Sequence, residues 1–231
     1  MDTVDFKLLR RRIAEAAAQT FRAVRNAHPA ESFYSFALYT ADDAVGVNPS
    51  ANSDEAYRSA VDRETADEAK TKFLVSNGIS LAASLLGDHR WSPYDWKYEC
   101  AESERFDLVN VLINNEGTGF YDEQDLLGFE KFKAGVLASM VLGLQDASAA
   151  GAFGIGAARD SVTLFCSVAS SEEAIWFEED SAKRLNAPAS FRIFFEERIK
   201  YIADGEEIEP ADPENVRGLY LARMDAAARA E

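Results

Sequence analysis

The most regular hydrophobic pattern in the chain lies between residues 129 and 150. Apolar residues recur there at steps of three and four, which places them on one face of a helix. Neighbouring positions are also apolar, so this helix is too hydrophobic for the surface and is predicted to be central and buried. The inward face comprises Phe129, Phe132, Val136, Met140, Leu144 and Ala147, and Leu137, Val141 and Leu142 widen it.

A glycine-rich corner and a buried strand are predicted to follow the central helix. Gly151 can adopt the left-handed conformation that ends a helix, and Gly154 and Gly156 allow a tight turn. Residues 162–166 are rich in β-branched and aromatic side chains, which favours a strand.

Helical spacing of apolar residues predicts further helices on both sides of this unit. In the first of them, Arg10, Arg11 and Arg12 fit either a phosphate-binding patch or, more commonly, a basic turn on a solvated face. Ser53 can cap the second. The predicted segments are 5–26, 53–65, 104–114, 181–186, 190–203 and 213–228.

Two other segments look extended. The aromatic run 33–40 is predicted to pair with residues 44–47 in a hairpin whose turn contains Asp42 and Asp43. Residues 174–177 are predicted as a strand, although a capping-box pattern precedes them. Between residues 66 and 86 the pattern fits either a hairpin or a helix.

Together these elements predict a single α+β domain over residues 1–231, with a mainly antiparallel sheet packed against helices. Hydrophobic residues make up 47% of the chain and charged residues 28%, so a core can form without metal or disulfide support. Cys100 and Cys166 lie far apart and outside any Cys-x-x-Cys pair, and neither a disulfide framework nor a metal site is predicted.

The charge balance narrows the choice of partners. The formal net charge is -16, which argues against nucleic acid and anionic membranes and suits a basic protein partner. The chain begins with acidic residues where a secretory signal needs positive charge, and no apolar run approaches the length of a membrane span. We therefore expect a cytoplasmic protein.

No catalytic motif can be recognised. The two histidines, His28 and His89, stand outside any nucleophile pattern, and Gly154-Ile155-Gly156 follows a helix instead of a strand and lacks the Lys-Ser/Thr ending of a phosphate loop. No catalytic residue or cofactor is predicted, and a binding role is favoured over catalysis.

Residues 90–98 have the most unusual composition, with two of the three tryptophans of the chain around a proline. One interpretation is a ligand pocket lined by Arg90, Trp91, Asp95 and Trp96, in which the rings supply shape and Arg90 an anion contact. The other is a core plug with Arg90 and Asp95 paired. Burial of both tryptophans would set the pocket aside.

Several short motifs resemble a bacterial family, the four-three-zero-three domain of unknown function. The match is expected to cover most of the chain up to about residue 202. The resemblance implies no activity and no catalytic residues, and by analogy such small acidic domains are similar to immunity proteins that neutralise toxins of rival cells. The motifs are Tyr34 to Tyr39 with Asn52, Arg90-Trp91-Ser92-Pro93 with Trp96, Gly151 with Phe153-Gly154 and Arg159, and Ser181 with Leu185-Asn186-Ala187-Pro188.

The leading functional hypothesis is a non-enzymatic acidic domain, an immunity-type inhibitor that docks on a basic toxin such as a nuclease. The alternative is a small-molecule-binding domain or an enzyme with a pocket at residues 90–96. A third hypothesis is an oligomeric scaffold, which would have a self-complementary apolar patch. The candidate docking residues are Asp42, Asp43, Glu178, Glu179, Asp180, Glu206, Glu207 and Glu209.

Overall fold

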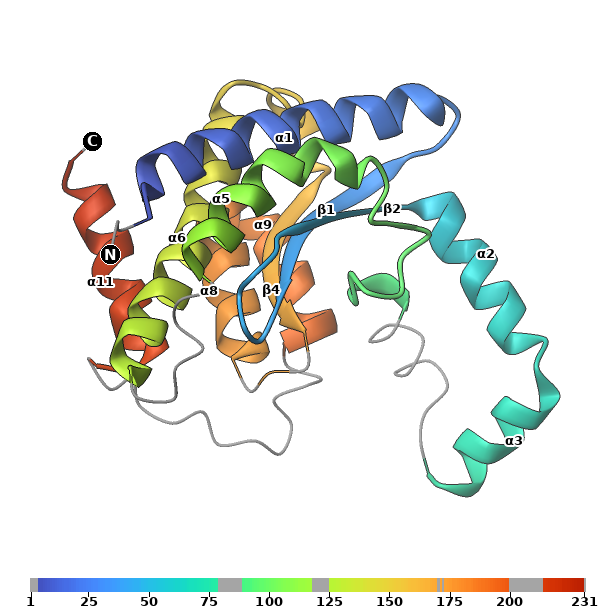
Figure 1. Ribbon diagram of the computed structural model, residues 1–231. Coiled ribbons are helices and arrows are strands. Elements are labelled where there is room, and N and C mark those ends of the chain that lie inside the picture. Colours follow the sequence, from blue (N-terminus) through green and yellow to red (C-terminus); the bar gives the residue numbers. More distant parts are fainter. Residues whose placement is uncertain are drawn as a thin grey trace.

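A four-stranded sheet lies at the centre of the fold, with helices around it (Figure 1). The strands are β1 (Phe33–Ala41), β2 (Asn48–Ser53), β3 (Tyr98–Glu99) and β4 (Thr163–Ala169), in the order β3-β2-β1-β4. The computed structural model describes residues 4–78, 89–117, 125–169, 171, 173–199 and 214–230.

Two of the three strand pairings, β1 with β2 and β2 with β3, are antiparallel, which confirms the predicted α+β class with a mainly antiparallel sheet. The third pairing is parallel and runs from Ser35 opposite Thr163 to Ala41 opposite Ala169. The first eight residues of β1 are all buried, because this strand lies inside the sheet and is covered on both faces.

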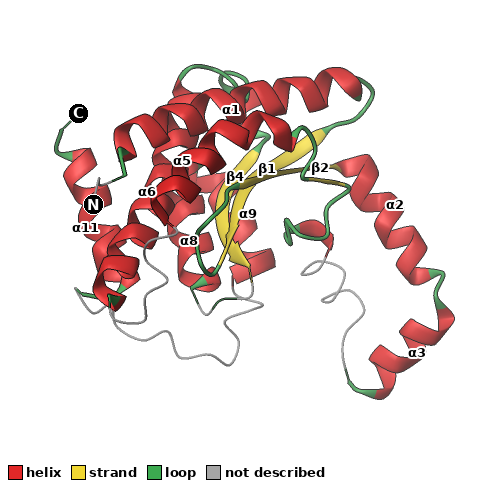
Figure 2. Ribbon diagram, viewed as in Figure 1, coloured by secondary structure: helices red, strands yellow, loops and turns green. Residues whose placement is uncertain are grey.

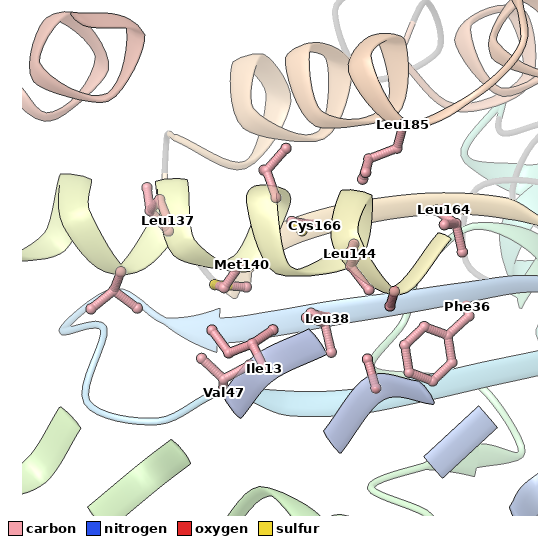
Figure 3. Packing of buried hydrophobic residues seen from close by; sticks show 14 of the residues in the cluster. Ile13, Phe36, Leu38, Val47, Leu137, Met140, Leu144, Leu164, Cys166 and Leu185 are labelled. Carbon is pink, nitrogen blue, oxygen red and sulfur yellow. The ribbon is translucent and has the colours of Figure 1, made fainter. Parts of the chain in front are cut away.

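The central helix is confirmed as α6 (Leu126–Ala149), and it packs against α1 (Phe6–Ala27). Small residues allow the two helices to approach closely. A Cβ atom added at Gly135 would lie 2.2 Å from the Phe6 ring, and one at Gly143 would lie 2.6 Å from Cγ2 of Ile13. Figure 3 shows Leu137, Met140 and Leu144 of α6 in the core beside Ile13 and Leu38.

The other predicted helices are largely confirmed (Figure 2). Ser53 caps α2 as expected, with its Oγ accepting from the Ala56 amide at 3.0 Å. Residues 68–76 of the ambiguous segment form a helix, and residues 79–86 lie outside the described part of the chain. The helices are α2 (Asp54–Thr65), α3 (Glu68–Ser76), the 3-10 helix η2 (Ser103–Phe106), α5 (Asp107–Gly117), α7 (Ala157–Asp160), α8 (Ala174–Leu185), α9 (Pro188–Phe194), the π-helix η4 (Phe195–Ile199) and α11 (Val216–Ala228).

The predicted strand at residues 174–177 is wrong, because these residues form the first turn of α8. The side chains of this helix enter two core clusters: Trp176, Phe177 and Leu185 belong to one, and Ile175 and Ala182 to the other. A helix buried on two sides has consecutive apolar residues, and such a short run cannot be distinguished from a buried strand by its pattern.

The hairpin after β1 exists, but its second strand is β2 at residues 48–53 and not 44–47. Ala44 takes a left-handed conformation at φ 55°, and residues 42–47 form the connection. Ala44 and Val47 are nevertheless buried, so their hydrophobicity reflects packing of a loop against the core and not a strand.

The two core clusters lie on opposite faces of the sheet, because neighbouring residues of one strand contribute to different clusters. Leu164 and Cys166 of β4 face the cluster that contains α1 and α6, whereas Phe165 faces the smaller one with Trp91 and Phe194. None of the helices in the described part of the chain has the length and apolarity that a bilayer crossing requires.

Candidate functional site

The predicted acidic residues that the structure describes do not form one docking surface. Asp42 lies in the turn after β1, where its carboxylate accepts a hydrogen bond from Lys133 Nζ at 2.8 Å. The side chain of Lys133 is only 4% exposed, and its ammonium also pairs with Glu173 at 2.7 Å. Hydrogen bonds from Lys133 and Ser171 lower the pKa of Asp42. The Asp42 carboxylate thus holds this turn on α6.

The predicted acidic turn at residues 178–180 is part of α8, and two of its three side chains are engaged within the protein. Glu178 is completely buried, so it is corrected from a docking residue to a core group. Asp180 accepts hydrogen bonds from Arg184 Nε at 2.6 Å and from the Tyr220 hydroxyl at 2.7 Å. Glu179 is half-buried. Glu206, Glu207 and Glu209 lie outside the described residues.

The tryptophan segment is a core plug. Trp91 is 1% exposed and Trp96 is 4% exposed, so the condition that sets the ligand pocket aside is met. Arg90 does not pair with Asp95 as expected but forms an ion pair with Glu197 of the π-helix at 2.9 Å, and the same carboxylate accepts from Trp91 Nε1 at 2.9 Å.

Hydrogen bonds connect this segment to the buried acid of α8. The Tyr94 hydroxyl lies 2.6 Å from Ser167 Oγ on β4, and Ser167 donates to Glu178 Oε1 at 2.6 Å. Arg198 of the π-helix completes the chain by donating to Glu178. Burial raises the pKa of Tyr94. Every link joins groups already satisfied inside the protein, which indicates a structural network.

The two cysteines do not form a reactive site. Cys166 is fully buried, and burial raises the pKa of its thiol. Burial also raises the pKa of Cys100, whose Sγ lies 3.2 Å from the Tyr39 hydroxyl. Thiols with raised pKa values are poor nucleophiles at neutral pH. In the ranges that the structure describes, no cluster of three or more His, Cys, Asp and Glu side chains is arranged to hold a metal ion.

An exposed surface that combines acidic and apolar groups runs along η2 and α5. Asp107, Val111 and Asn114 are spaced by three or four residues, as are Leu108 and Val111, so these four share one side of α5, and Glu104 of η2 precedes Asp107 by three residues. Leu108 is 63% exposed and Val111 is 50% exposed, although Val109 and Ile113 of the same helix are buried. We call this surface the α5 face, and it comprises Glu104, Asp107, Leu108, Val111 and Asn114.

The acidic groups of the α5 face are free to meet a partner. Neither Glu104 nor Asp107 has an ion-pair partner among the described residues. The neighbouring cation, Arg105, is engaged by Glu102, with its Nη2 donating at 2.7 Å. Our sequence-based list of acidic candidates missed this face. A signal existed in the sequence, because Leu108 and Val111 are apolar residues that lie on a different face of this helix from Val109 and Ile113.

Comparison with protein families identifies the domain. The family model for a domain of unknown function, DUF4303, matches residues 13–187, which span the chain from α1 to the residues just after α8. Comparison with curated proteins and with solved structures gave no significant match. Since the family model covers well over half of the sequence, the chain belongs to the DUF4303 family.

Proposed function

We propose that this chain is a non-catalytic protein-binding domain that docks on a basic protein through the α5 face. The observation that carries the proposal is the exposure of Leu108 and Val111, at 63% and 50%, beside the carboxylates of Glu104 and Asp107. Protein contact surfaces have an apolar centre surrounded by a polar rim. Apolar side chains flanked by carboxylates fit that composition.

The two kinds of group contribute differently to binding. Burying a leucine or valine side chain in an interface contributes about 1.5–3 kcal/mol. The acidic rim, together with a net charge of -16, attracts a basic partner and accelerates its association. Affinity therefore depends mainly on the apolar pair, and the choice of partner mainly on the carboxylates.

The partner that we propose is a basic toxin such as a nuclease, with this chain as its immunity-type inhibitor in the cytoplasm. A nuclease needs cationic groups to hold phosphates, and those groups are complementary to an acidic surface. An inhibitor of this kind needs no catalytic machinery, because it acts by covering the surface of the toxin.

The test uses the product of the neighbouring reading frame, since inhibitor and toxin genes are usually adjacent. Binding is measured at low and high salt for wild type and for the double variant Glu104→Lys/Asp107→Lys. The matched control, Asp62→Lys/Glu68→Lys on α2 and α3, has the same net charge at another exposed site.

We expect Glu104→Lys/Asp107→Lys to weaken binding by at least about tenfold, because like charges then face each other across the contact. The control is expected to slow association slightly, through the change in net charge alone. Equal weakening by both double variants would show that only overall charge matters, and it would reject the α5 face. If no basic protein encoded nearby is bound even at low salt, the inhibitor hypothesis is wrong.

A further inference from the structure

A basic cavity lies at the end of α1, on a protein that is otherwise strongly acidic. Its volume is about 660 Å³, within the range typical of small-molecule sites. One wall is the last part of α1, with Arg22 and Arg25, and the next is the turn that carries His28. The corner after α6 also lines the cavity, where Gly151 and Gly154 lack side chains.

Arg22 and Arg25 are not committed to carboxylates. Neither forms an ion pair with another residue of the described chain, whereas Arg10 on the same helix is held by Asp146 through two bonds of 2.6 Å. Arg25 rests near the ring of Phe21, with its guanidinium carbon 5.7 Å from the centroid.

The negative groups near the cavity have a weaker effect than the two positive charges of Arg22 and Arg25. Glu31 borders the cavity, but its carboxylate already accepts from Lys97 at 2.9 Å and from Tyr98 at 2.6 Å. The C-terminal ends of α1 and α6 also meet here, and each contributes about half a negative charge. The two guanidinium groups outweigh both helix ends, so the cavity favours an anion.

We propose that this cavity binds the phosphate group of a small molecule. Arg22 and Arg25 are three residues apart on a helix, so both side chains can reach one ligand group. The two oxygens of a carboxylate are satisfied by the paired N–H groups of one guanidinium, whereas a phosphate has enough oxygens to accept hydrogen bonds from two guanidinium groups. His28 and Asn26 line the same cavity and supply further hydrogen-bonding groups.

The experiment is calorimetric titration of the full chain with inorganic phosphate, ribose 5-phosphate and ribose. Wild type is compared with Arg22→Gln/Arg25→Gln. The matched control is Arg58→Gln/Arg63→Gln, which removes two exposed arginines of α2 and changes the net charge equally. Thermal unfolding of each variant verifies that it is folded.

We expect ribose 5-phosphate to bind wild type, ribose to give no signal, and Arg22→Gln/Arg25→Gln to lower the affinity at least about tenfold, as the loss of charge-assisted hydrogen bonds requires. The control should bind as wild type does. Equal affinity for inorganic phosphate would support the site and identify the free ion as a sufficient ligand. The proposal is overturned if neither phosphate binds, or if both double variants lose affinity equally.

Discussion

The Arg198 guanidinium on the π-helix donates hydrogen bonds of 3.0 and 3.3 Å to the Glu178 carboxylate on α8, which is completely buried. Arg198 directly precedes Ile199 of the smaller core cluster, and Glu178 directly follows Phe177 of the larger one. A buried carboxylate is tolerated only while its charge is matched and its oxygens are bonded.

We expect Arg198→Met to lower the free energy of unfolding by about 3–5 kcal/mol, because it leaves the Glu178 charge buried without its cation. The measurement is urea denaturation, with Arg192→Met, which changes an exposed arginine of α9, as the control. Glu178→Gln/Arg198→Met should recover part of the loss, because glutamine carries no charge and can still accept from Ser167. A loss no greater than that of the control would contradict this account.

The close contact between α1 and α6 depends on a residue without a side chain. At Gly143 an added Cβ would lie 2.6 Å from Cγ2 of Ile13 and 3.0 Å from the backbone oxygen of Arg10. Overpacking costs about 3 kcal/mol at its upper range, and alanine gains about 1 kcal/mol over glycine in a helix. Gly143→Ala should therefore destabilise the protein by about 2 kcal/mol in chemical denaturation.

The control for that substitution is Gly46→Ala, where the nearest atom to the new Cβ is 3.9 Å away. It is expected to leave the free energy of unfolding nearly unchanged. A stability of Gly143→Ala equal to or above that of wild type would mean that the two helices separate without cost.

The charge of Glu31 makes stability depend on acid pH. Burial alone would raise the pKa of Glu31, but hydrogen bonds from Ser53, Tyr98 and Lys97 outweigh it and lower the pKa from 4.5 to about 2. A carboxyl with a lowered folded-state pKa stabilises the fold above its unfolded pKa, and this contribution disappears as the pH falls through the folded value.

We therefore expect the free energies of unfolding of wild type and Glu31→Gln to differ by a constant amount above pH 4.5 and to converge between pH 4.5 and about 2. Denaturation curves for both proteins across this interval provide the measurement. A difference that does not change with pH would show that the Glu31 contacts do not depend on its ionisation.

The apolar pair of the α5 face is expected to affect binding without affecting folding. Leu108→Ala/Val111→Ala removes side chains that are 63% and 50% exposed, so the free energy of unfolding should stay within about 0.5 kcal/mol of wild type. Affinity for the basic partner should fall, since the centre of the contact is lost. Val109→Ala, at a buried position of the same helix, should do the reverse and destabilise the fold.

The sequence by itself determined most of the helices. Phe132, Val136 and Met140 identify α6 because a helix with a buried face must repeat its apolar residues at the helical period. Ser53 marks the start of α2 because its hydroxyl satisfies a free amide there. Such signals depend on residues within a few positions of one another, which is why they could be interpreted without the fold.

Tertiary structure alone decided which polar groups are available at the surface. Glu178 and Glu179 are adjacent acids, but only Glu178 meets Arg198, twenty residues further along the chain, and becomes part of the core. Trp91 is buried and Leu108 is exposed because of what packs on each, and not because of their own hydrophobicity. The parallel pairing of β1 with β4 is likewise long-range, because it joins strands more than a hundred residues apart. Contacts between residues far apart in the sequence leave no local periodicity, so the candidate sites could be identified only from the folded chain.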